Sequence, residues 1–597
     1  MSEKPNPLPT DFSAMSRQWM DMWTENTKAA TQMWANMVPG MSSPFSNPLE
    51  QWQQLVDSIG DASINTQDLG EAQMKLWQDT LKLWASAGKS GDDSAPVISP
   101  VRGDRRFRSD NWNDGSVFDF MKQSYLLASR YLEDALDTVE GLDEKRSQQL
   151  RFYTRQYVDA MSPTNFAATN PDVLNKTMES GGQNLVSGIT NMMDDLKKGK
   201  GKLKISMTDT DAFEMGKNVA TTPGHIVYQN ELMQLIQYAP STEKVSKRPM
   251  LIIPPWINKY YILDLQPENS LIRWLVSEGH TVFVISWVNP DASLSDKGFE
   301  DYLMQGPLAA LDAMEEATGE NSFNVTGYCL GGTLLSALLA YTEATGDERI
   351  KSGTFYTSMI DFTDPGELGV YIDEMQLSSL EQKMDEQGFL EGSDMATAFN
   401  MLRSNDLIWS FVINNYLMGK DPMAFDLLYW NSDSTRMPAC MHKEYLRTMY
   451  LENRFKEPGG MVLNGVPIDV SSITTPVYFI STIEDHIAPW KSTYMGARLF
   501  SGPVKFVLGG SGHIAGIINP AESNKYGYWT KSGKLADSAD KWLDGAKQNE
   551  GSWWPDWSRW LKRHAGTGVA ARHAGDGKLD IIEAAPGSYA SLRLDKQ

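Results

Sequence analysis

The string Gly-Tyr-Cys-Leu-Gly-Gly at residues 327–332 contains the residues that most clearly suggest chemistry in this sequence. It follows a strand-like run, SFNVT, and precedes the small and apolar TLLSALLA. A tight turn there forces its central residue, Cys329, into a strained backbone, and glycines two positions to either side remove side chains that would collide with the neighbouring strand and helix. The pattern predicts a nucleophile elbow with cysteine in place of serine. A buried free cysteine in a tight turn is the alternative.

A nucleophilic thiol needs a base, and a strand–turn–helix nucleophile of this type is followed in the chain by an acid and then by a histidine. The apolar run that begins at Val477 leads into Asp485, and the run that begins at Val504 leads through a glycine-rich loop into His513. Both residues follow predicted strands, at the edge where open α/β sheets assemble their sites. We therefore predict that His513 is the general base and that Asp485 fixes its tautomer.

Neighbouring residues offer competing assignments for both positions. Glu484 is a second candidate for the acid, and His486 is a second candidate for the base. Because His486 directly adjoins Asp485 in sequence, we interpret it as a residue that lines the substrate pocket. Either Asp485 or His513 alone could be an incidental surface residue, but their order after Cys329 favours a triad.

Backbone N–H groups are expected to stabilise the charge of a transition state at this site. The elbow supplies the N–H of Leu330, and the loop after Met250–Ile253 supplies the second, for which Ile257 is the candidate. Two prolines in that loop stiffen the backbone that must present the group. The sequence has no phosphate-binding glycine loop, dinucleotide fingerprint or metal-ligand spacing, so we expect no cofactor.

Composition restricts the class of protein. A length of 597 residues exceeds what one core usually supports, so two domains are expected. The net charge of −22 argues against nucleic-acid binding, and the lysine-rich run at residues 197–204 is interpreted as a solvated linker. Only two cysteines, Cys329 and Cys440, occur, which fits a reducing compartment. The first ten residues do not resemble a signal peptide and no apolar run approaches a membrane span, so a cytoplasmic location is predicted.

Residues 1–200 are predicted to form an all-helical N-terminal domain. Trp and Met recur at helical spacing over residues 13–38, and again in a second set that consists of Met74, Trp77, Leu81 and Trp84. These apolar stripes either pack against other helices or form a surface that adsorbs to a lipid-like or polymeric phase.

Residues 201–597 are predicted to form an α/β domain with a mainly parallel sheet, because short apolar runs alternate there with helical stretches. The rhythm is interrupted from about residue 363 to residue 470, a helical interval that we interpret as a cap inserted into the sheet domain. The tail from His564 is rich in Ala and Gly and is expected to be partly mobile. The runs that we assign to strands are Met250–Ile253, Thr281–Trp287, Ser322–Thr326, Thr354–Ile360, Val477–Ser481 and Val504–Leu508.

From about residue 95 onward the chain resembles the class I polyhydroxyalkanoate synthases. The strings that carry the resemblance include FYTRQYVDAMSPTNFAATNP, PPWINKYYILDLQPENSLIRWLVSEGHTVFVISWVNPDAS, GYCLGG, FDLLYWNSDST, EDHIAPW, SGHIAGIINP and GSWWPDW. The resemblance is weakest over the first 90 and the last 30 residues. It implies an α/β-hydrolase fold in which Cys329 takes the acyl chain as a thioester, His513 activates the thiol and Asp485 completes the triad.

The resemblance also implies partners and pocket residues. Family members carry a helical N-terminal domain linked to dimerisation and granule attachment, so a homodimer at the polyhydroxyalkanoate granule surface, in contact with granule-associated proteins, is expected. Trp430 matches a family tryptophan associated with dimer contacts. Trp430, Arg403 and His486 are taken as candidates for the substrate pocket.

The expected activity is polymerisation of (R)-3-hydroxyacyl-CoA, such as 3-hydroxybutyryl-CoA, with release of CoA. Moving an acyl group from the CoA sulfur to Cys329 exchanges one thioester for another, and the 3-hydroxyl of a second acyl group then forms the polymer ester. Either His513 or Asp485 deprotonates that hydroxyl. Two alternatives remain: a hydrolase such as an intracellular polyester depolymerase, and a granule-coating protein without activity.

Overall fold

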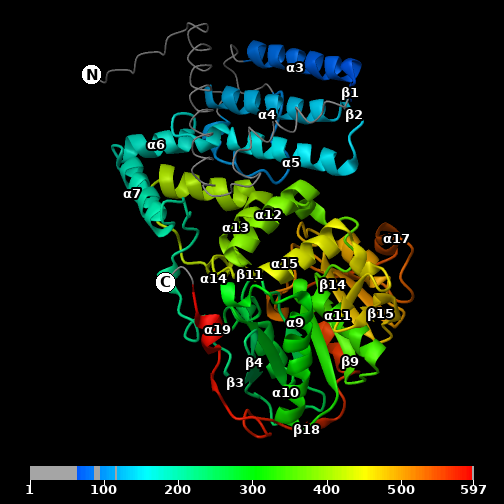
Figure 1. Cartoon of the computed structure of the whole chain (residues 1–597). Coiled ribbons are helices and arrows are strands. Elements are labelled where there is room, and N and C mark those ends of the chain that lie inside the picture. Colours follow the sequence, from blue (N-terminus) through cyan, green and yellow to red (C-terminus); the bar gives the residue numbers. More distant parts are fainter. Residues whose placement is uncertain (1–62, 87–94, 114–116, 594–597) are drawn as a thin grey trace. The chain divides into compact units, whose positions relative to one another are not determined.

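The computed structural model describes residues 63–86, 95–113 and 117–593, and the chain divides into two compact units (Figure 1). The N-terminal unit consists of Met1–Ser206 together with Arg403–Pro422. The second, which we call the sheet unit, consists of Met207–Leu402 and Met423–Gln597. The amphipathic segment expected at residues 13–38 lies outside the described residues.

The described part of the N-terminal unit is built mainly from helices, beside one short strand pair in which β1 (Ser63–Ile64) pairs with β2 (Val139–Glu140). Helix α4 packs against both α3 and α5. Polar caps fix two helix starts, since the side chain of Asp143 accepts the N–H of Arg146 before α5 and Asn170 caps α6 ahead of a proline. The helices are α3 (Thr66–Ser86), α4 (Val117–Leu136), α5 (Glu144–Ala160), α6 (Pro171–Glu179) and α7 (Gln183–Lys198).

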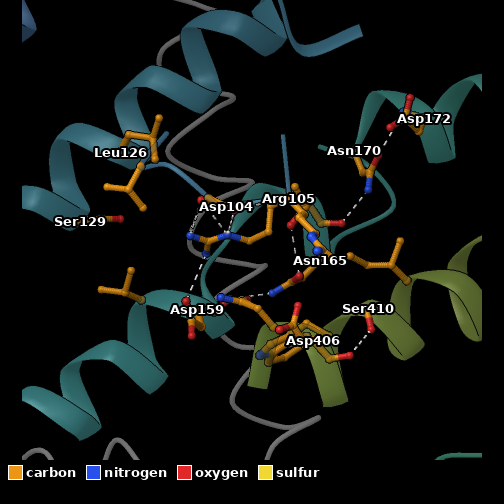
Figure 2. Close-up of a pocket in the computed structure, with 18 of the residues that line it drawn as sticks. Asp104, Arg105, Leu126, Ser129, Asp159, Asn165, Asn170, Asp172, Asp406 and Ser410 are labelled. Carbon is orange, nitrogen blue, oxygen red and sulfur yellow. Dashed lines mark hydrogen bonds and ion pairs between the residues drawn. The ribbon is translucent and has the colours of Figure 1, made fainter. Parts of the chain in front are cut away.

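A polar cavity of about 1350 Å³ lies within the N-terminal unit, between α4, α5, α6 and two π-helical turns, η9 (Asn405–Trp409) and η10 (Val412–Leu417). Figure 2 shows the polar side chains that surround it, including Asp104, Asp159 and Asp406. Arg106 forms ion pairs with Asp104 at 2.9 Å and with Asp159 at 3.2 Å. Residues 403–422, which the sequence analysis assigned to the cap, are thus grouped with the N-terminal helices.

The sheet unit is organised around an eleven-stranded sheet in the order β17-β16-β15-β14-β9-β8-β6-β7-β4-β3-β19. The central pairs from β15 to β7 are parallel, whereas the outer strands pair antiparallel. The predicted mainly parallel sheet is therefore confirmed. The strands are β3 (Gly224–Gln229), β4 (Met233–Tyr238), β6 (Met250–Ile253), β7 (Val282–Trp287), β8 (Phe323–Tyr328), β9 (Ile350–Tyr356), β14 (Val477–Thr482), β15 (Val504–Gly509), β16 (Tyr528–Thr530), β17 (Lys547–Asn549) and β19 (Glu583–Ala584).

Strand β9 begins and ends earlier in the chain than its apolar run suggested. The run Thr354–Ile360 predicted a strand that extends to Ile360, but β9 ends at Tyr356. The next residue, Thr357, has a φ of 42°. A β-branched residue in that region of backbone space interrupts an extended strand, and so the apolar residues beyond it are buried in a loop.

Both faces of the sheet are buried, which explains why its central strands read as continuous apolar runs. Along β6, Leu251 and Ile253 belong to one buried apolar cluster, while Met250 and Ile252 belong to another. This alternation is the two-residue period of a strand. Helices that contribute to these clusters include α8 (Leu271–Ser277), α10 (Ala309–Thr318), α11 (Leu330–Thr345) and α18 (Trp554–Leu561).

The chain between β9 and β14 is largely helical, as expected of an inserted cap. Its helices within the sheet unit include α12 (Glu374–Gln387), α13 (Gly392–Leu402), α14 (Asp426–Asn431) and α15 (Ala439–Tyr445), and the last continues as the π-helix η11 (Leu446–Leu451). No helix in the ranges that the structure describes is both long enough and apolar enough to span a membrane.

The C-terminal tail is packed into the sheet unit, which differs from the partly mobile tail expected from its composition. Its strand β18 (Gly568–Ala570) pairs with β5 (Lys244–Ser246), and β19 pairs with β3 at the sheet edge. Near its end, the Arg593 guanidinium lies 4.2 Å from the ring centroid of Tyr429 and 3.6 Å from the carboxylate of Asp433. Strand-pairing hydrogen bonds and this buried charge contact hold the tail in place. Its many small residues had given no indication that it packs against the sheet.

Candidate active site

Cys329 lies in the strained turn that the sequence predicted. It follows the last residue of β8, precedes the first residue of α11 and has φ and ψ angles of 53° and −118°. A Cβ at Gly327 would lie 2.5 Å from the Gly331 carbonyl oxygen, and a Cβ at Gly331 would lie 1.9 Å from the Ile253 carbonyl oxygen. Only glycine allows these approaches, so the elbow geometry is confirmed.

Asp485 and His513 are brought together by two neighbouring parallel strands. The last residue pair of β14 and β15 is Thr482 with Gly509, so the loops that follow both strands start side by side. His513 Nδ1 lies 2.7 Å from Asp485 Oδ2, and both residues are more than 90% buried. The other carboxylate oxygen accepts the backbone N–H groups of Ile487 and Ala488, each at 2.9 Å.

The His513 imidazole also lies close to the thiol of Cys329, whose charge and hydrogen bonding are among the causes that raise the pKa of the imidazole. Because Nδ1 of His513 is hydrogen-bonded to Asp485, Nε2 is the ring nitrogen that remains for the thiol. Burial alone would lower the pKa of His513, but the charge of Asp485, followed by that of Cys329, outweighs it and raises the pKa to about 10. An imidazolium is therefore favoured beside the sulfur.

The geometry separates the competing acids and bases. Glu484 is exposed, and its described contact is a backbone N–H bond to the Ser511 carbonyl oxygen at 3.0 Å. The carboxylate that reaches the imidazole belongs to Asp485. His486 is half-buried beside it, so its role as a pocket residue stays a prediction.

The two predicted oxyanion donors lie on elements that meet at the elbow. Leu330 is the first residue of α11, so its N–H has no acceptor within the helix. The loop that contains Ile257 starts at the end of β6, against which Gly331 packs. Thr435 holds this loop, since its N–H donates to the Ile257 carbonyl at 3.0 Å and its hydroxyl donates to the Trp256 carbonyl. The Ile257 N–H as a second donor stays a prediction.

The remaining pocket candidates are Trp430 and Arg403. Trp430 is 6% exposed, and its indole N–H donates to the Lys259 carbonyl oxygen at 2.7 Å. Arg403 belongs to the N-terminal unit, where its guanidinium bonds Asp406 at 2.7 Å. Neither side chain has a described contact with the triad, and their roles in a substrate pocket remain predictions.

Two tyrosines of the cap, Tyr445 and Tyr450, lie close to the thiol and were missed by the sequence analysis. Their rings are 5.4 Å apart and edge-on. Burial raises both pKa values, and the charge of Cys329 contributes to each increase. The phenols therefore stay protonated and can donate hydrogen bonds near the sulfur. Tyr445 directly precedes the π-helix η11 and Tyr450 lies within it, and their five-residue spacing equals the hydrogen-bond step of a π-helix, for which the sequence has no apolar pattern.

Comparisons with known proteins identify the family of this chain. Residues 103–275 match the family described as "Poly-beta-hydroxybutyrate polymerase (PhaC) N-terminus", and residues 248–520 match the family described as "alpha/beta hydrolase fold". A protein of Methylorubrum extorquens named poly(3-hydroxyalkanoate) polymerase is 45% identical, over 99% of this chain and 100% of its own length. The chain belongs to the poly(3-hydroxyalkanoate) polymerase family.

Other members of this polymerase family extend the match. The polymerase subunit PhaC of Rhizobium meliloti is 47% identical over 94% of this chain and 90% of its own, and that of Cupriavidus necator is 41% identical over 99% and 96%. Among solved structures, a monoacylglycerol lipase of Paleococcus ferrophilus covers 56% of this chain and 99% of its own at 12% identity, with a TM-score of 0.31. The predicted resemblance and α/β-hydrolase fold are confirmed, and the chain is an acyltransferase.

Proposed function

We propose that this enzyme polymerises (R)-3-hydroxyacyl-CoA into a polyhydroxyalkanoate polyester, with release of CoA, through a thioester on Cys329. The observation that carries the proposal is the position of the His513 imidazole, which is hydrogen-bonded to the buried Asp485 carboxylate and lies close enough to the Cys329 thiol for that thiol to raise its pKa. This arrangement occurs in a chain that belongs to the polymerase family.

Acylation begins when the Cys329 thiolate attacks the thioester carbonyl of the substrate. The carbon forms a bond to the Cys329 sulfur and breaks its bond to the CoA sulfur, and the imidazolium of His513 gives its proton to the departing thiolate. Backbone N–H groups of Leu330 and Ile257 stabilise the oxyanion. The acyl group remains a thioester and therefore stays activated.

Elongation begins when the 3-hydroxyl of a second acyl group attacks the carbonyl carbon on Cys329. An oxoester forms, the bond to the Cys329 sulfur breaks, and the hydroxyl proton passes to the protein. His513 fits the role of acceptor, because after acylation its Nε2 is left without a proton. Asp485 would first have to give up its contacts with Ile487, Ala488 and His513.

The granule, dimer and location assignments form part of the same proposal. On helix α3, the exposed fractions of Met74, Trp77 and Leu81 are 60%, 64% and 60%. An apolar stripe at helical spacing that remains this exposed suits a hydrophobic polymer surface. We place the enzyme in the cytoplasm at the granule as a homodimer with granule-associated proteins.

A depolymerase is the second candidate, because the same thiol, base and fold could pass the acyl group to water. The test incubates the purified protein with 3-hydroxybutyryl-CoA and measures free thiol, solvent-extracted polyester and free 3-hydroxybutyrate. We expect CoA release to be matched by ester-linked polymer. If free 3-hydroxybutyrate accumulates in proportion to the released CoA and no polymer forms, the enzyme is a hydrolase and not a polymerase.

A further inference from the structure

Tyr328, the residue directly before the nucleophile, contacts the residue assigned as the base. Its ring stacks on the His513 imidazole, with centroids 5.7 Å apart and planes 23° apart. Its hydroxyl donates a hydrogen bond to the backbone carbonyl of His513 at 3.2 Å. Tyr328 is 2% exposed, so both contacts are shielded from water.

The loop that carries His513 is rich in glycine. Its sequence is Gly509-Gly-Ser511-Gly512, and Ser511 has a φ of 68°. Glycines lose more conformational entropy on ordering than any other residue, so a loop of this composition needs anchors. Asp485 anchors the imidazole edge, whereas Tyr328 anchors the ring face and the backbone carbonyl.

We propose that Tyr328 is a positioning residue, which ties the loop of His513 to the strand of Cys329 and holds the imidazole ring against the thiol. The inference deepens the proposed function and rests on the roles given there to Cys329 and His513. The link between the base and the nucleophile is direct, because Tyr328 and Cys329 are consecutive residues. A displacement of β8 would move thiol and imidazole together.

The stacking also has an electrostatic consequence. The face of a phenol ring attracts a cation within about 6 Å of its centroid, and an imidazolium of His513 lies in that position. The other groups that face the pair are Asp485 and, beside Cys329, Tyr445 and Tyr450. Loss of the ring should therefore shift the balance from thiolate and imidazolium toward thiol and imidazole.

The test measures alkylation of Cys329 by iodoacetamide across pH, in a Cys440→Ser background that leaves one reactive thiol. Tyr328→Leu removes the ring and the hydroxyl, whereas Tyr328→Phe removes the hydroxyl alone. Tyr356→Leu is the matched control, because that buried ring lies edge-on to Tyr328 at 6.2 Å without a described contact to His513.

At neutral pH we expect Tyr328→Leu to alkylate roughly tenfold more slowly, from loss of the cation–π contact, and to recover at alkaline pH. Tyr328→Phe should alkylate about two- to fivefold more slowly, the effect of one hydrogen bond. Tyr356→Leu should keep the wild-type pH profile even if its Tm falls. Should Tyr328→Leu fail to fold, Tyr328→Phe decides, since an unchanged alkylation rate in that variant overturns the inference.

Two further outcomes separate this inference from the proposed function. A wild-type protein that makes polymer, together with a folded Tyr328→Leu variant that has the wild-type alkylation profile, overturns the role of Tyr328 alone. A wild-type protein that releases no CoA, but whose alkylation profile shifts in Tyr328→Leu, removes the proposed function and leaves the positioning role supported.

Discussion

Acid should destabilise the sheet unit through two histidines buried in neutral form, His280 and His442. Each is 1% exposed. Burial lowers the pKa of both to about 4, from an ordinary value of 6.5, and at His280 nearby Glu278 opposes this only in part. At pH values well above 6.5, neither the folded nor the unfolded chain binds these protons. Burial of the two imidazoles therefore costs no ionisation free energy there.

As the pH falls from 6.5 to 4, the unfolded chain takes up the protons while the folded chain does not, so stability is lost. The 2.5-unit difference gives about 3 kcal/mol for each histidine, and the two together approach the whole stability of a typical domain. His442 lies on α15, which ends at Tyr445 near the thiol, so activity should fall in the same range.

The assay is urea unfolding, followed by tryptophan fluorescence at about pH 7.5 and at about pH 5, which lies inside the interval where the linkage removes stability. His442→Leu should lose less stability between the two pH values than the wild type, by about 2 kcal/mol. The control His573→Gln, an exposed histidine, should behave as the wild type. An equal acid loss in His442→Leu and the wild type would refute the reasoning.

Three further predictions follow from the geometry. Gly331→Ala should distort the elbow and cost more than about 2 kcal/mol in urea unfolding together with most CoA release, while Gly568→Ala, which meets open space, should be neutral in both assays. Asp485→Asn should slow acylation of the thiol by at least about tenfold in rapid quench, and a variant that acylates normally but cannot elongate would make Asp485 the hydroxyl base. Trp77→Ser with Leu81→Ser should reduce co-sedimentation with polymer granules at unchanged Tm; equal sedimentation would end the adsorption role of α3.

The elbow and the order of the triad could be predicted from the sequence because their signals are local. The glycines around Cys329 form a pattern within six residues, although one of the collisions that they avoid is with the distant Ile253 carbonyl, and the loops of Asp485 and His513 follow strands whose apolar runs are continuous. Parallel neighbours bring their carboxyl ends to one edge, so a strand assignment was enough to bring two distant residues together.

Other features depend on contacts that no local pattern encodes. Tyr445 and Tyr450 reach the thiol only through the fold of the cap, and their spacing follows a π-helix rather than an α-helix. Residues 403–422 group with helices more than 200 positions earlier in the chain. The tail is held by strand pairing and by Arg593, whereas its composition alone suggested mobility.

The proposed mechanism requires an acyl group that is carried by Cys329. Rapid acid quench of the enzyme with 3-hydroxybutyryl-CoA, followed by peptide mass analysis, should find hydroxybutyryl mass on the peptide that contains Cys329. Neutral hydroxylamine should remove it, as expected of a thioester. Cys329→Ala should show neither the adduct nor CoA release, whereas Cys440→Ser should show both. An adduct on another residue, or wild-type CoA release by Cys329→Ala, would contradict the account.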